Sequence, residues 1–140
     1  MAVVQDIDRT PGLGAFAGEV HCSILQALVC AGYVTNGTVR YLHAVEATGF
    51  QLFAAGPAVS HAYAHLIDFG GIVEVGGLSV STGDLLHGDQ HGVLNVPLQI
   101  AGEIPRVVEE IAGQRCEVIE FCKSPKFSVK ELEGLIKQQP

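Results

Sequence analysis

Apolar and polar residues alternate along the first half of the chain with two different periods. The short runs "AVVQDID", "YVTNG" and "FQLFAAG" are largely apolar and end in polar or turn-forming residues, which predicts three strands. Between them, "EVHCSILQALVCA" (residues 19–31) and "TVRYLHAVEAT" (residues 38–48) have apolar residues three to four positions apart, which predicts two helices. Strands that alternate with helices favour parallel pairing with crossover helices. The first half therefore predicts a parallel β-α-β arrangement.

Turn-forming residues separate these elements. The Pro-Gly segment "RTPGLGAFAG" predicts a loop before the first helix, Gly32 is the expected stop of that helix, and Gly49 closes the second helix. The spacing of five apolar residues gives the first helix one apolar stripe, as is typical of an amphipathic helix. The stripe consists of Val20, Ile24, Ala27, Leu28 and Ala31.

From residue 72 onward the pattern changes to that of hairpins. "IVEVGGLSV" predicts two strands about a Gly-Gly turn, and "DLLHGDQHGVLNVP" predicts a second pair about Asp-Gln-His-Gly. After Pro97 the pattern becomes helical, and the tail "SVKELEGLIKQQ" begins with Ser128 and Glu131 at the spacing of a capping box, which predicts a terminal helix. The predicted fold class is α/β, with a mixed sheet or partial barrel. The apolar residues with helical spacing after Pro97 are Ile104, Val107, Val108 and Ile111.

Length and charge limit the classes of protein that the chain can be. Its 140 residues fit one domain over residues 1–140, with a core over residues 1–123 and a C-terminal helix or tail over residues 124–140. The net charge of −7, with only eight Lys and Arg, argues against nucleic-acid binding. No apolar run reaches the roughly 18 residues of a membrane span, and the N-terminus lacks the pattern of a secretion signal. These features predict a cytoplasmic protein that does not bind membranes.

Composition adds two further expectations. Hydrophobic residues make up 48% of the chain and charged residues only 16%, which predicts a compact fold whose surface is partly covered by other subunits. The four cysteines have no Cys-x-x-Cys spacing. Because a reduced thiol behaves as a small apolar residue, we expect all four to be buried. They are Cys22, Cys30, Cys116 and Cys122.

The residues best suited to chemistry lie at two places in the first half. Gly18, Glu19, Val20 and His21 lie where a glycine-containing loop enters the first helix, so free backbone N–H groups and the helix dipole there could hold a carboxylate or an enolate oxygen. Arg40 follows the next strand, and open α/β sheets bring binding residues together at the carboxyl ends of neighbouring strands. Its planar guanidinium suits an α-keto acid, since it can bond the carboxylate and polarise the ketone. His21 is also a candidate proton carrier.

Plainer interpretations stay open for these residues and for the other histidines. Gly18 can serve only the turn, Arg40 can be a solvated charge and His21 a capping residue. His61 and His65 in "SHAYAH" would share a face if this stretch were helical, and "HGDQH" alternates metal-ligand types along one strand. Because two ligands do not make a closed site, a loop or interface segment and a polar hairpin turn are favoured there. The alternating residues are His87, Asp89 and His91, and Asp84 before them is expected to be a turn residue.

Three motifs resemble those of a known family. They are an acidic residue followed after twenty residues by arginine (Glu19 to Arg40), the "NGTVR" turn, and the late hairpin "GDLLHGDQHGV". Together they make most of residues 1–123 similar to the RraA-like family, which includes a regulator of ribonuclease E activity and 4-hydroxy-4-methyl-2-oxoglutarate aldolases. The resemblance implies a swivelling β/β/α domain, assembled into homotrimers or homohexamers with the active site between subunits.

The resemblance also implies a chemistry. In aldolase members a divalent metal, usually magnesium, helps to bind pyruvate. The segment matching Gly18 to His21 holds the substrate through backbone amides, and the arginine matching Arg40 contacts it. Retro-aldol cleavage, or decarboxylation of oxaloacetate, passes through a pyruvate enolate whose charge the metal and the arginine stabilise. Such an enzyme would be a class II-type, metal-dependent aldolase or decarboxylase.

Two departures from the family pattern bear on this implication. Tyr41 stands where the family has a metal-ligand aspartate and Ala44 where a further acidic residue is expected, whereas magnesium prefers carboxylates and water. Glu46 lies roughly 200° further around a helix than residue 44, and Glu19 suits a metal-bound water better than the metal itself. Family members usually carry an N-terminal segment before the first strand, so the resemblance implies a shortened relative or a fragment with an open sheet edge.

Two functions stay open on this basis. The first is a lyase that acts on a pyruvate-derived 2-oxo acid, which Gly18, Glu19 and Arg40 favour. The second is a relative without metal chemistry that serves as a regulatory or carboxylate-binding protein, which Tyr41 and Ala44 favour. A small-molecule 2-oxo acid is the partner expected for the first function, and a protein or a carboxylate for the second.

Overall fold

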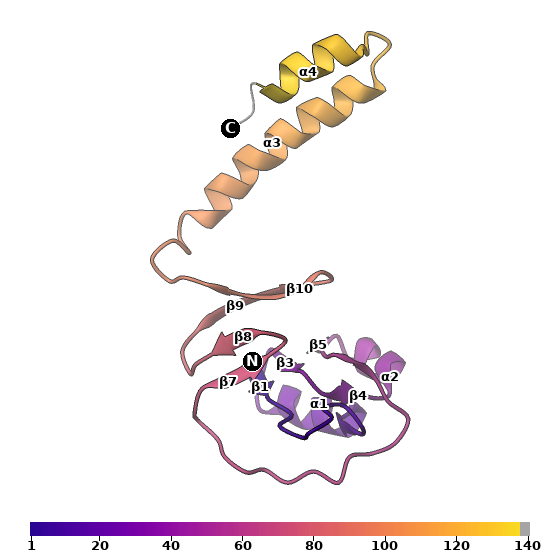
Figure 1. The fold of residues 1–140 in the computed structure, drawn as a ribbon, viewed down its shortest axis with the longest axis vertical. Helices are drawn as coiled ribbons and strands as arrows, with labels where there is room; N and C mark the ends of the chain where they lie inside the picture. Colours follow the sequence, from indigo (N-terminus) through magenta and orange to yellow (C-terminus); the bar gives the residue numbers. More distant parts are fainter. Residues whose placement is uncertain (138–140) are drawn as a thin grey trace. The chain divides into compact units, whose positions relative to one another are not determined.

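The computed structural model describes residues 1–137 and divides the chain into two compact units (Figure 1). The first unit comprises Met1–Val96, and the second begins at Pro97. Within the described residues, every strand lies in the first unit. The expectation of one domain over residues 1–140, with its core in residues 1–123, stays a prediction.

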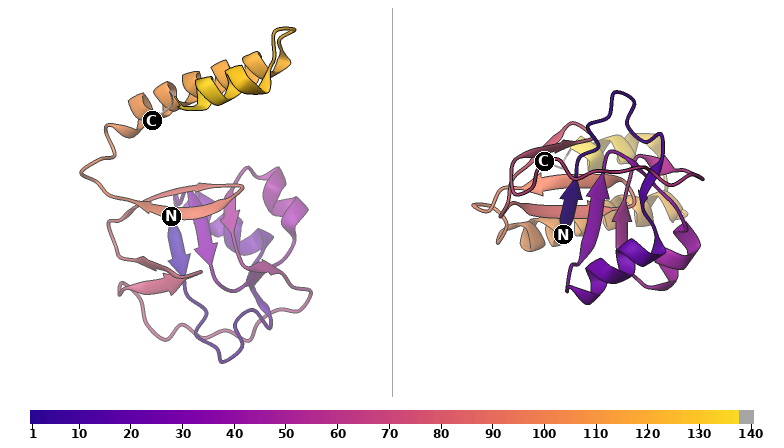
Figure 2. Two further views of the ribbon diagram at one scale, coloured as in Figure 1. Left: turned by 45° about the horizontal axis from the view of Figure 1, so that its top comes forward. Right: turned by 90° about the horizontal axis from the view of Figure 1, so that it is seen from below.

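A three-stranded parallel sheet lies at the centre of the first unit, in the order β1-β3-β5 (Figure 2). Along the chain, helix α1 lies between β1 and β3, and helix α2 lies between β3 and β5. This order confirms the predicted alternation of strands and helices. The bounds are Ala2–Val4 for β1, Glu19–Ala27 for α1, Gly32–Thr35 for β3, Leu42–Ala47 for α2 and Gln51–Phe53 for β5.

A second parallel sheet, in the order β2-β4-β6, corrects two expectations. β2, Ala15–Ala17, lies inside the segment predicted as a loop, and β4, Thr38–Val39, occupies the first two residues of the predicted second helix. β6 is Gly56–Pro57. These short strands form because their backbone groups bond to one another, a tertiary effect that outweighs local propensity. The second helix consequently starts at Leu42 instead of residue 38.

The apolar stripe of α1 faces away from the core of the first unit. Val20 is 74% exposed, Ile24 56% and Leu28 72%, whereas Cys22 is fully buried. The helix also ends at Ala27, and Gly32 belongs to β3 instead of acting as the stop. Its inward face is therefore narrow, and a large apolar surface is left uncovered within the described chain.

Two clusters of buried side chains hold the first unit together. One lies between the central sheet and the helices and contains Tyr33 and Val45, and the other lies against the hairpins and contains Val34, Val75 and Val80. Full burial of a valine side chain contributes about 1.5–3 kcal/mol. The other members of the first cluster are Ala17, Cys22, Val39 and Phe50.

Both predicted hairpins are confirmed. β7, Val73–Val75, pairs with β8, Leu78–Val80, and β9, Leu85–Asp89, pairs with β10, Gly92–Val96. The first turn needs glycine, since Gly76 and Gly77 both have positive φ (+58° and +83°). The described chain is thus a mixed α/β protein with parallel sheets and antiparallel hairpins, as the pattern predicted.

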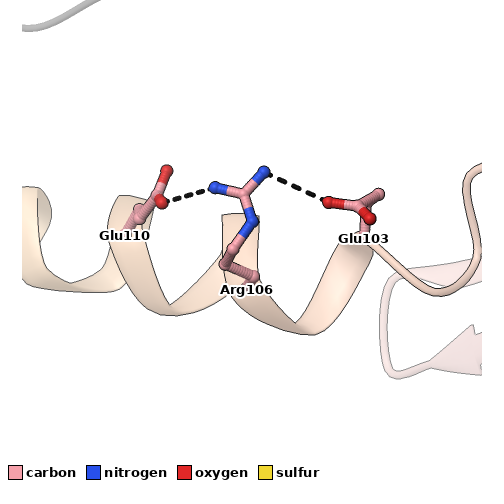
Figure 3. A network of polar contacts seen from close by, with 3 residues as sticks. All are labelled: Glu103, Arg106 and Glu110. Atoms are coloured by element: carbon pink, nitrogen blue, oxygen red, sulfur yellow. Dashed lines mark hydrogen bonds and ion pairs between the residues drawn. The ribbon is translucent and has the colours of Figure 1, made fainter.

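The second unit contains two helices that pack on each other, α3 (Ile104–Lys123) and α4 (Val129–Lys137). The predicted cap of α4 is present, because the Glu131 N–H donates to the Ser128 hydroxyl oxygen at 3.3 Å. Residues 138–140 of the predicted tail lie outside the described residues. On α3, Arg106 pairs with Glu103 and Glu110 (Figure 3). Exposed pairs of this kind contribute little to stability.

The expectation of four buried cysteines is only half right. Cys22 is buried and Cys30 half-buried, and all four thiols are free. Cys116 and Cys122 are exposed, because α3 packs against α4 along only part of its surface and buries no residue fully.

Candidate functional site

Gly18 and Arg40 lie side by side because the two strands that precede them are neighbours. β2 leads directly into Gly18, β4 leads into Arg40, and Ala17 pairs with Val39 in the parallel register. The Arg40 N–H donates to the Ala17 carbonyl at 3.0 Å. Both residues therefore lie at the carboxyl ends of adjacent parallel strands, which is where open α/β sheets collect binding residues.

Gly18 permits a close approach of the next two side chains. A Cβ atom at this position would lie 3.2 Å from Tyr41 Cδ2 and 3.3 Å from Arg40 Cγ, tighter than most real contacts. A larger residue would therefore push Arg40 or Tyr41 away from the start of α1. The small side chain, more than any backbone requirement, explains glycine here, because its φ of −160° is open to any residue.

The first turn of α1 offers unbonded amide groups beside Arg40. Gly18 is the N-cap, and the first helical hydrogen bond runs from the Cys22 N–H to the Gly18 carbonyl at 2.9 Å. The N–H groups of Glu19, Val20 and His21 precede that bond and have no acceptor within the helix. No side chain caps this end, so the amides and the positive end of the helix dipole can face an anion.

The Arg40 guanidinium lies over the ring of Tyr41, with 5.0 Å between Cζ and the ring centroid. Within residues 1–137 no carboxylate forms a salt bridge with Arg40, so its charge is not neutralised there. Tyr41 is 59% exposed and adopts a left-handed conformation, with φ +58° and ψ +41°. This conformation is uncommon for residues other than Gly, Asn and Asp, so the position is strained.

The His21 side chain is held by aromatic neighbours. Its ring centroid lies 4.8 Å from that of Phe16 and 5.5 Å from that of Tyr33, both in edge-on geometry. Burial lowers the pKa of His21 below 6.5. The neutral ring that results at pH 7 adds no positive charge beside Arg40, and its role as a proton carrier stays a prediction. Glu19 is exposed, as is Val20.

The "NGTVR" motif has a structural role that the sequence did not reveal. The Asn36 side chain exchanges two hydrogen bonds with the backbone of Asp6, at 2.6 and 2.9 Å. The Asp6 carboxylate in turn accepts from the Gly12 N–H at 2.8 Å, and the Thr38 hydroxyl donates to the Gly12 carbonyl at 3.0 Å. These bonds fix the loop before β2 against the start of β4, and so set the strand ends on which the candidate site depends.

The rival histidine sites do not assemble. The stretch with His61 and His65 is not helical, so the two do not share a helix face. In the β9–β10 hairpin, the Asp89 carboxylate accepts from the His91 backbone N–H at 2.8 Å and lies 3.2 Å from His91 Nδ1, which lowers the pKa of Asp89. Asp84 accepts from the Ser81 N–H, as a turn residue does. Across residues 1–137, no three His, Cys, Asp or Glu side chains are grouped to hold a metal.

The side chains around Arg40 do not suit the magnesium ion that the resemblance implies. Magnesium requires hard oxygen ligands, above all carboxylates, in octahedral geometry. Position 41 offers a phenol ring under a guanidinium, and position 44 a methyl group. Glu46 lies on α2 with its carboxylate 82% exposed and 3.9 Å from His43. The donor set is therefore a poor match for this metal.

Two open hollows of the first unit lie elsewhere, along β5. One is lined by residues 51–54 and 89–92, and the other by residues of α2 together with residues 49–52. Neither is lined by Arg40 or by residues 18–21. The candidate site at Arg40 thus lies outside both hollows, and Gly18, His21 and Arg40 are themselves half-buried.

Comparison with known families decides what kind of chain this is. The Aldolase/RraA model of RraA-like proteins matches residues 1–95, which include both strands that carry Gly18 and Arg40. The chain belongs to the RraA-like family. The resemblance predicted from the sequence motifs is thereby confirmed.

One curated protein and two solved structures are similar to this RraA-like chain. A protein of Halalkalibacterium halodurans named "Putative 4-hydroxy-4-methyl-2-oxoglutarate aldolase" is 31% identical over 86 residues, which cover 59% of this chain and 40% of that protein. The crystal structure of an uncharacterized protein from Pseudomonas syringae pv. tomato str. DC3000 has a TM-score of 0.76 at 22% identity, covering 98% of this chain and 62% of the other.

The third is the crystal structure of Streptomyces coelicolor RraAS2, a protein described as an unusual member of the RNase ES inhibitor RraA protein family. It has a TM-score of 0.63 at 21% identity and covers 84% of this chain and 60% of the other. At these identities the two structures support the fold alone. The RraA-like chain spans less than two thirds of the length of each relative. Across its described residues, no helix is both long and apolar enough to cross a membrane.

Proposed function

We propose that the chain binds a small 2-oxo acid at Arg40 and acts as an RraA-like lyase, through retro-aldol cleavage or oxaloacetate decarboxylation. The observation that carries this proposal is the adjacency of Gly18 and Arg40, which puts the unbonded amides at the start of α1 next to an arginine that no described carboxylate neutralises. The relative named as an aldolase supports the class of reaction. The Aldolase/RraA family model that matches residues 1–95 agrees with that class.

The chemistry follows from where negative charge develops. Cleavage of the C3–C4 bond, one carbon away from the C2 ketone, leaves its electron pair on the C2–C3 unit as a pyruvate enolate. C4 departs as carbon dioxide in the decarboxylation, or as a second carbonyl compound whose hydroxyl proton is lost to solvent in the retro-aldol reaction. The enolate oxygen is more basic than the ketone oxygen. Donors already aimed at that oxygen stabilise it more than they stabilise the bound substrate, and this difference lowers the barrier. Arg40 can bond the carboxylate and the developing oxyanion together, because its N–H groups form a planar fork. The amides of residues 19–21 would hold the remaining oxygen.

Removal of the guanidinium tests the proposal. Hydrogen bonds to charged groups contribute about 1.5–3 kcal/mol, so Arg40→Ala is expected to weaken the binding of pyruvate and of oxalate, an enolate analogue, at least about tenfold. Isothermal titration calorimetry measures this change. Arg40→Lys should recover only part of the affinity, because an ammonium group cannot bond two oxygens in one plane.

Arg106→Ala is the matched control. Arg106 is an exposed arginine of the second unit, already paired with Glu103 and Glu110, and its loss should leave oxalate affinity unchanged. Equal affinity of Arg40→Ala and wild type would return Arg40 to the role of a surface charge and defeat the proposal.

A second candidate function is a binding or regulatory protein that holds a carboxylate without turning it over. Tyr41 favours it, since this residue stands where the resemblance places a metal ligand. Oxaloacetate decarboxylation distinguishes the two functions. Turnover that disappears in Arg40→Ala supports the lyase, whereas tight oxalate binding without turnover of oxaloacetate or a retro-aldol substrate supports the binding protein.

A further inference from the structure

The side chain of Tyr41, which stands where the resemblance places a carboxylate, contacts its neighbours in this structure. Its ring lies beneath the Arg40 guanidinium at 5.0 Å, and its backbone holds a left-handed conformation that a tyrosine rarely adopts. Gly18 lies against the same ring, since a Cβ there would be 3.2 Å from Tyr41 Cδ2. The ring thus contacts the start of α1 and lies under the guanidinium, while Tyr41 as a whole stays 59% exposed.

This packing changes what Arg40 can do. A guanidinium on a long side chain ordinarily samples many rotamers, and fixing it costs conformational entropy on binding. An aromatic face attracts the guanidinium and restricts it, so part of that cost is met before the ligand arrives. The orientation then depends on the ring face and not on the phenol oxygen.

The same ring takes the place from which a carboxylate would hold a divalent cation. Neither Ala44 nor the exposed Glu46 replaces it, and no group of three acidic, histidine or cysteine side chains forms within residues 1–137. The positive charge available to an anion here therefore comes from Arg40 and from the start of α1.

We propose that this site binds its carboxylate ligand without a divalent metal, and that Tyr41 is a positioning residue that holds Arg40 through its ring. The inference rests on the proposed function, because it concerns the same anion at Arg40. It extends that function, because the Tyr41 ring and the Arg40 guanidinium take over the part of ligand binding that the resemblance assigns to a metal ion in aldolase members of the family.

The test measures oxalate affinity by calorimetry, once with magnesium and once with EDTA. The wild-type protein should show the same dissociation constant in both, to within about twofold. Tyr41→Phe keeps the ring face and should match wild type. Tyr41→Ala removes the ring and should weaken binding about two- to fivefold, the range for an exposed cation–π contact. Arg106→Ala, the exposed and already paired arginine of the second unit, is again the control and should have no effect.

Tyr41→Asp provides the reciprocal test. A carboxylate at this position should make oxalate binding stronger with magnesium than with EDTA, and should reduce the electron paramagnetic resonance signal of free aqueous manganese, which wild type should leave unchanged. Circular dichroism spectra that match wild type establish that each variant is folded. The metal signal is independent of any catalytic activity.

The outcomes separate this inference from the proposed function. Wild-type binding that depends on Arg40 but appears only with magnesium overturns the inference and leaves the function standing. Equal affinity of Tyr41→Ala and wild type, or loss of affinity in Tyr41→Phe, overturns the role of the ring. Absence of oxalate and pyruvate binding under both conditions defeats the proposed function, and the inference falls with it.

Discussion

His21 shows how a single residue divides its backbone and its side chain between two tasks. Its N–H group belongs to the first turn of α1, next to Arg40, while its ring packs edge-on against Phe16 and Tyr33. Burial lowers the pKa of the His21 ring and raises the pKa of Tyr33 to about 12. Both rings are therefore neutral near pH 7, and protonating His21 would put a charge against apolar side chains.

The lowered pKa of His21 predicts a loss of stability in mild acid. Below its ordinary value of 6.5, the unfolded chain binds a proton at His21 that the folded chain does not yet bind. The free energy of unfolding should therefore fall as the pH drops from 7 towards 5, and His21→Gln should reduce that fall. Thermal unfolding followed across this pH range measures the difference.

His43→Gln is the matched control for this prediction, because the His43 side chain is fully exposed. It should leave the pH dependence of the melting temperature as in wild type. If both variants change the pH dependence equally, or neither does, the buried ring is not the source of the effect.

At the residue scale, the sequence predicted Arg40 and residues 18–21 near one another from the parallel strands "AVVQDID" and "YVTNG", whereas the structure brings them together through the unpredicted strands β2 and β4. The sequence could not reveal the contact of Arg40 with Tyr41, which depends on side-chain rotamers and on the left-handed backbone at residue 41. It also missed Asp6, whose bond partner Asn36 is thirty residues away. Contacts of this separation leave no local pattern to read.

At the scale of the element, the C-terminal end of α1 contains a strained residue, Val29. The helix closes with a Schellman motif, in which the Cys30 N–H bonds to the Leu25 carbonyl at 2.9 Å and the Val29 N–H to the Gln26 carbonyl at 3.0 Å. The residue at the centre of this motif must be left-handed, and here Val29 has φ +61°. A β-branched residue in that conformation is a marked exception.

Val29→Gly should stabilise the protein. Glycine adopts a positive φ without steric cost, and relief of the strain is expected to raise the free energy of unfolding by about 1 kcal/mol, net of the entropy that glycine adds to the unfolded chain. Val29 is 92% exposed, so little buried surface is lost. Chemical denaturation measures the change. Gly49→Ala is the reciprocal variant, since Gly49 ends α2 with φ +71° and should lose stability. A destabilised Val29→Gly would contradict this account.

Elements of different length were predictable to different degrees. The β-α-β order and the two hairpins followed from their periods and glycine turns, and α3 and α4 followed from their spacing and the Ser128 cap. β2 and β4 did not, because three and two residues are too few for a period, and they form only by pairing with each other. The sequence also could not show that the apolar stripe of α1 faces away from the core of the first unit, because an amphipathic pattern does not say which surface covers its apolar side.

At the scale of the whole molecule, the first unit exposes an unusual amount of apolar surface. Besides the stripe of α1, the segment of residues 58–72 runs over the surface with only an isolated bridge at His61. Val59, Tyr63 and Phe69 in this segment are each more than 90% exposed. Exposed apolar surface marks contact sites where it is contiguous. The homo-oligomer stays a prediction.

Self-association is the resulting prediction. Sedimentation velocity at micromolar concentration should show species heavier than the 14.8 kDa monomer, and they should persist in high salt because the contacts are apolar. Replacing Tyr63 and Phe69 by serine should shift the distribution towards monomer without changing the circular dichroism spectrum. A wild-type protein that is monomeric at every concentration would leave this surface without the subunit contact proposed for it.

The central claim, that the start of α1 and Arg40 hold one anion, is tested most directly by nuclear magnetic resonance on ¹⁵N-labelled protein titrated with oxalate. We predict that the amide signals of Glu19, Val20 and His21 and the Nε signal of Arg40 shift together and saturate with one dissociation constant. Shifts confined to other residues, such as those that line the hollows along β5, or an Arg40 signal that does not move while the amides do, would contradict it.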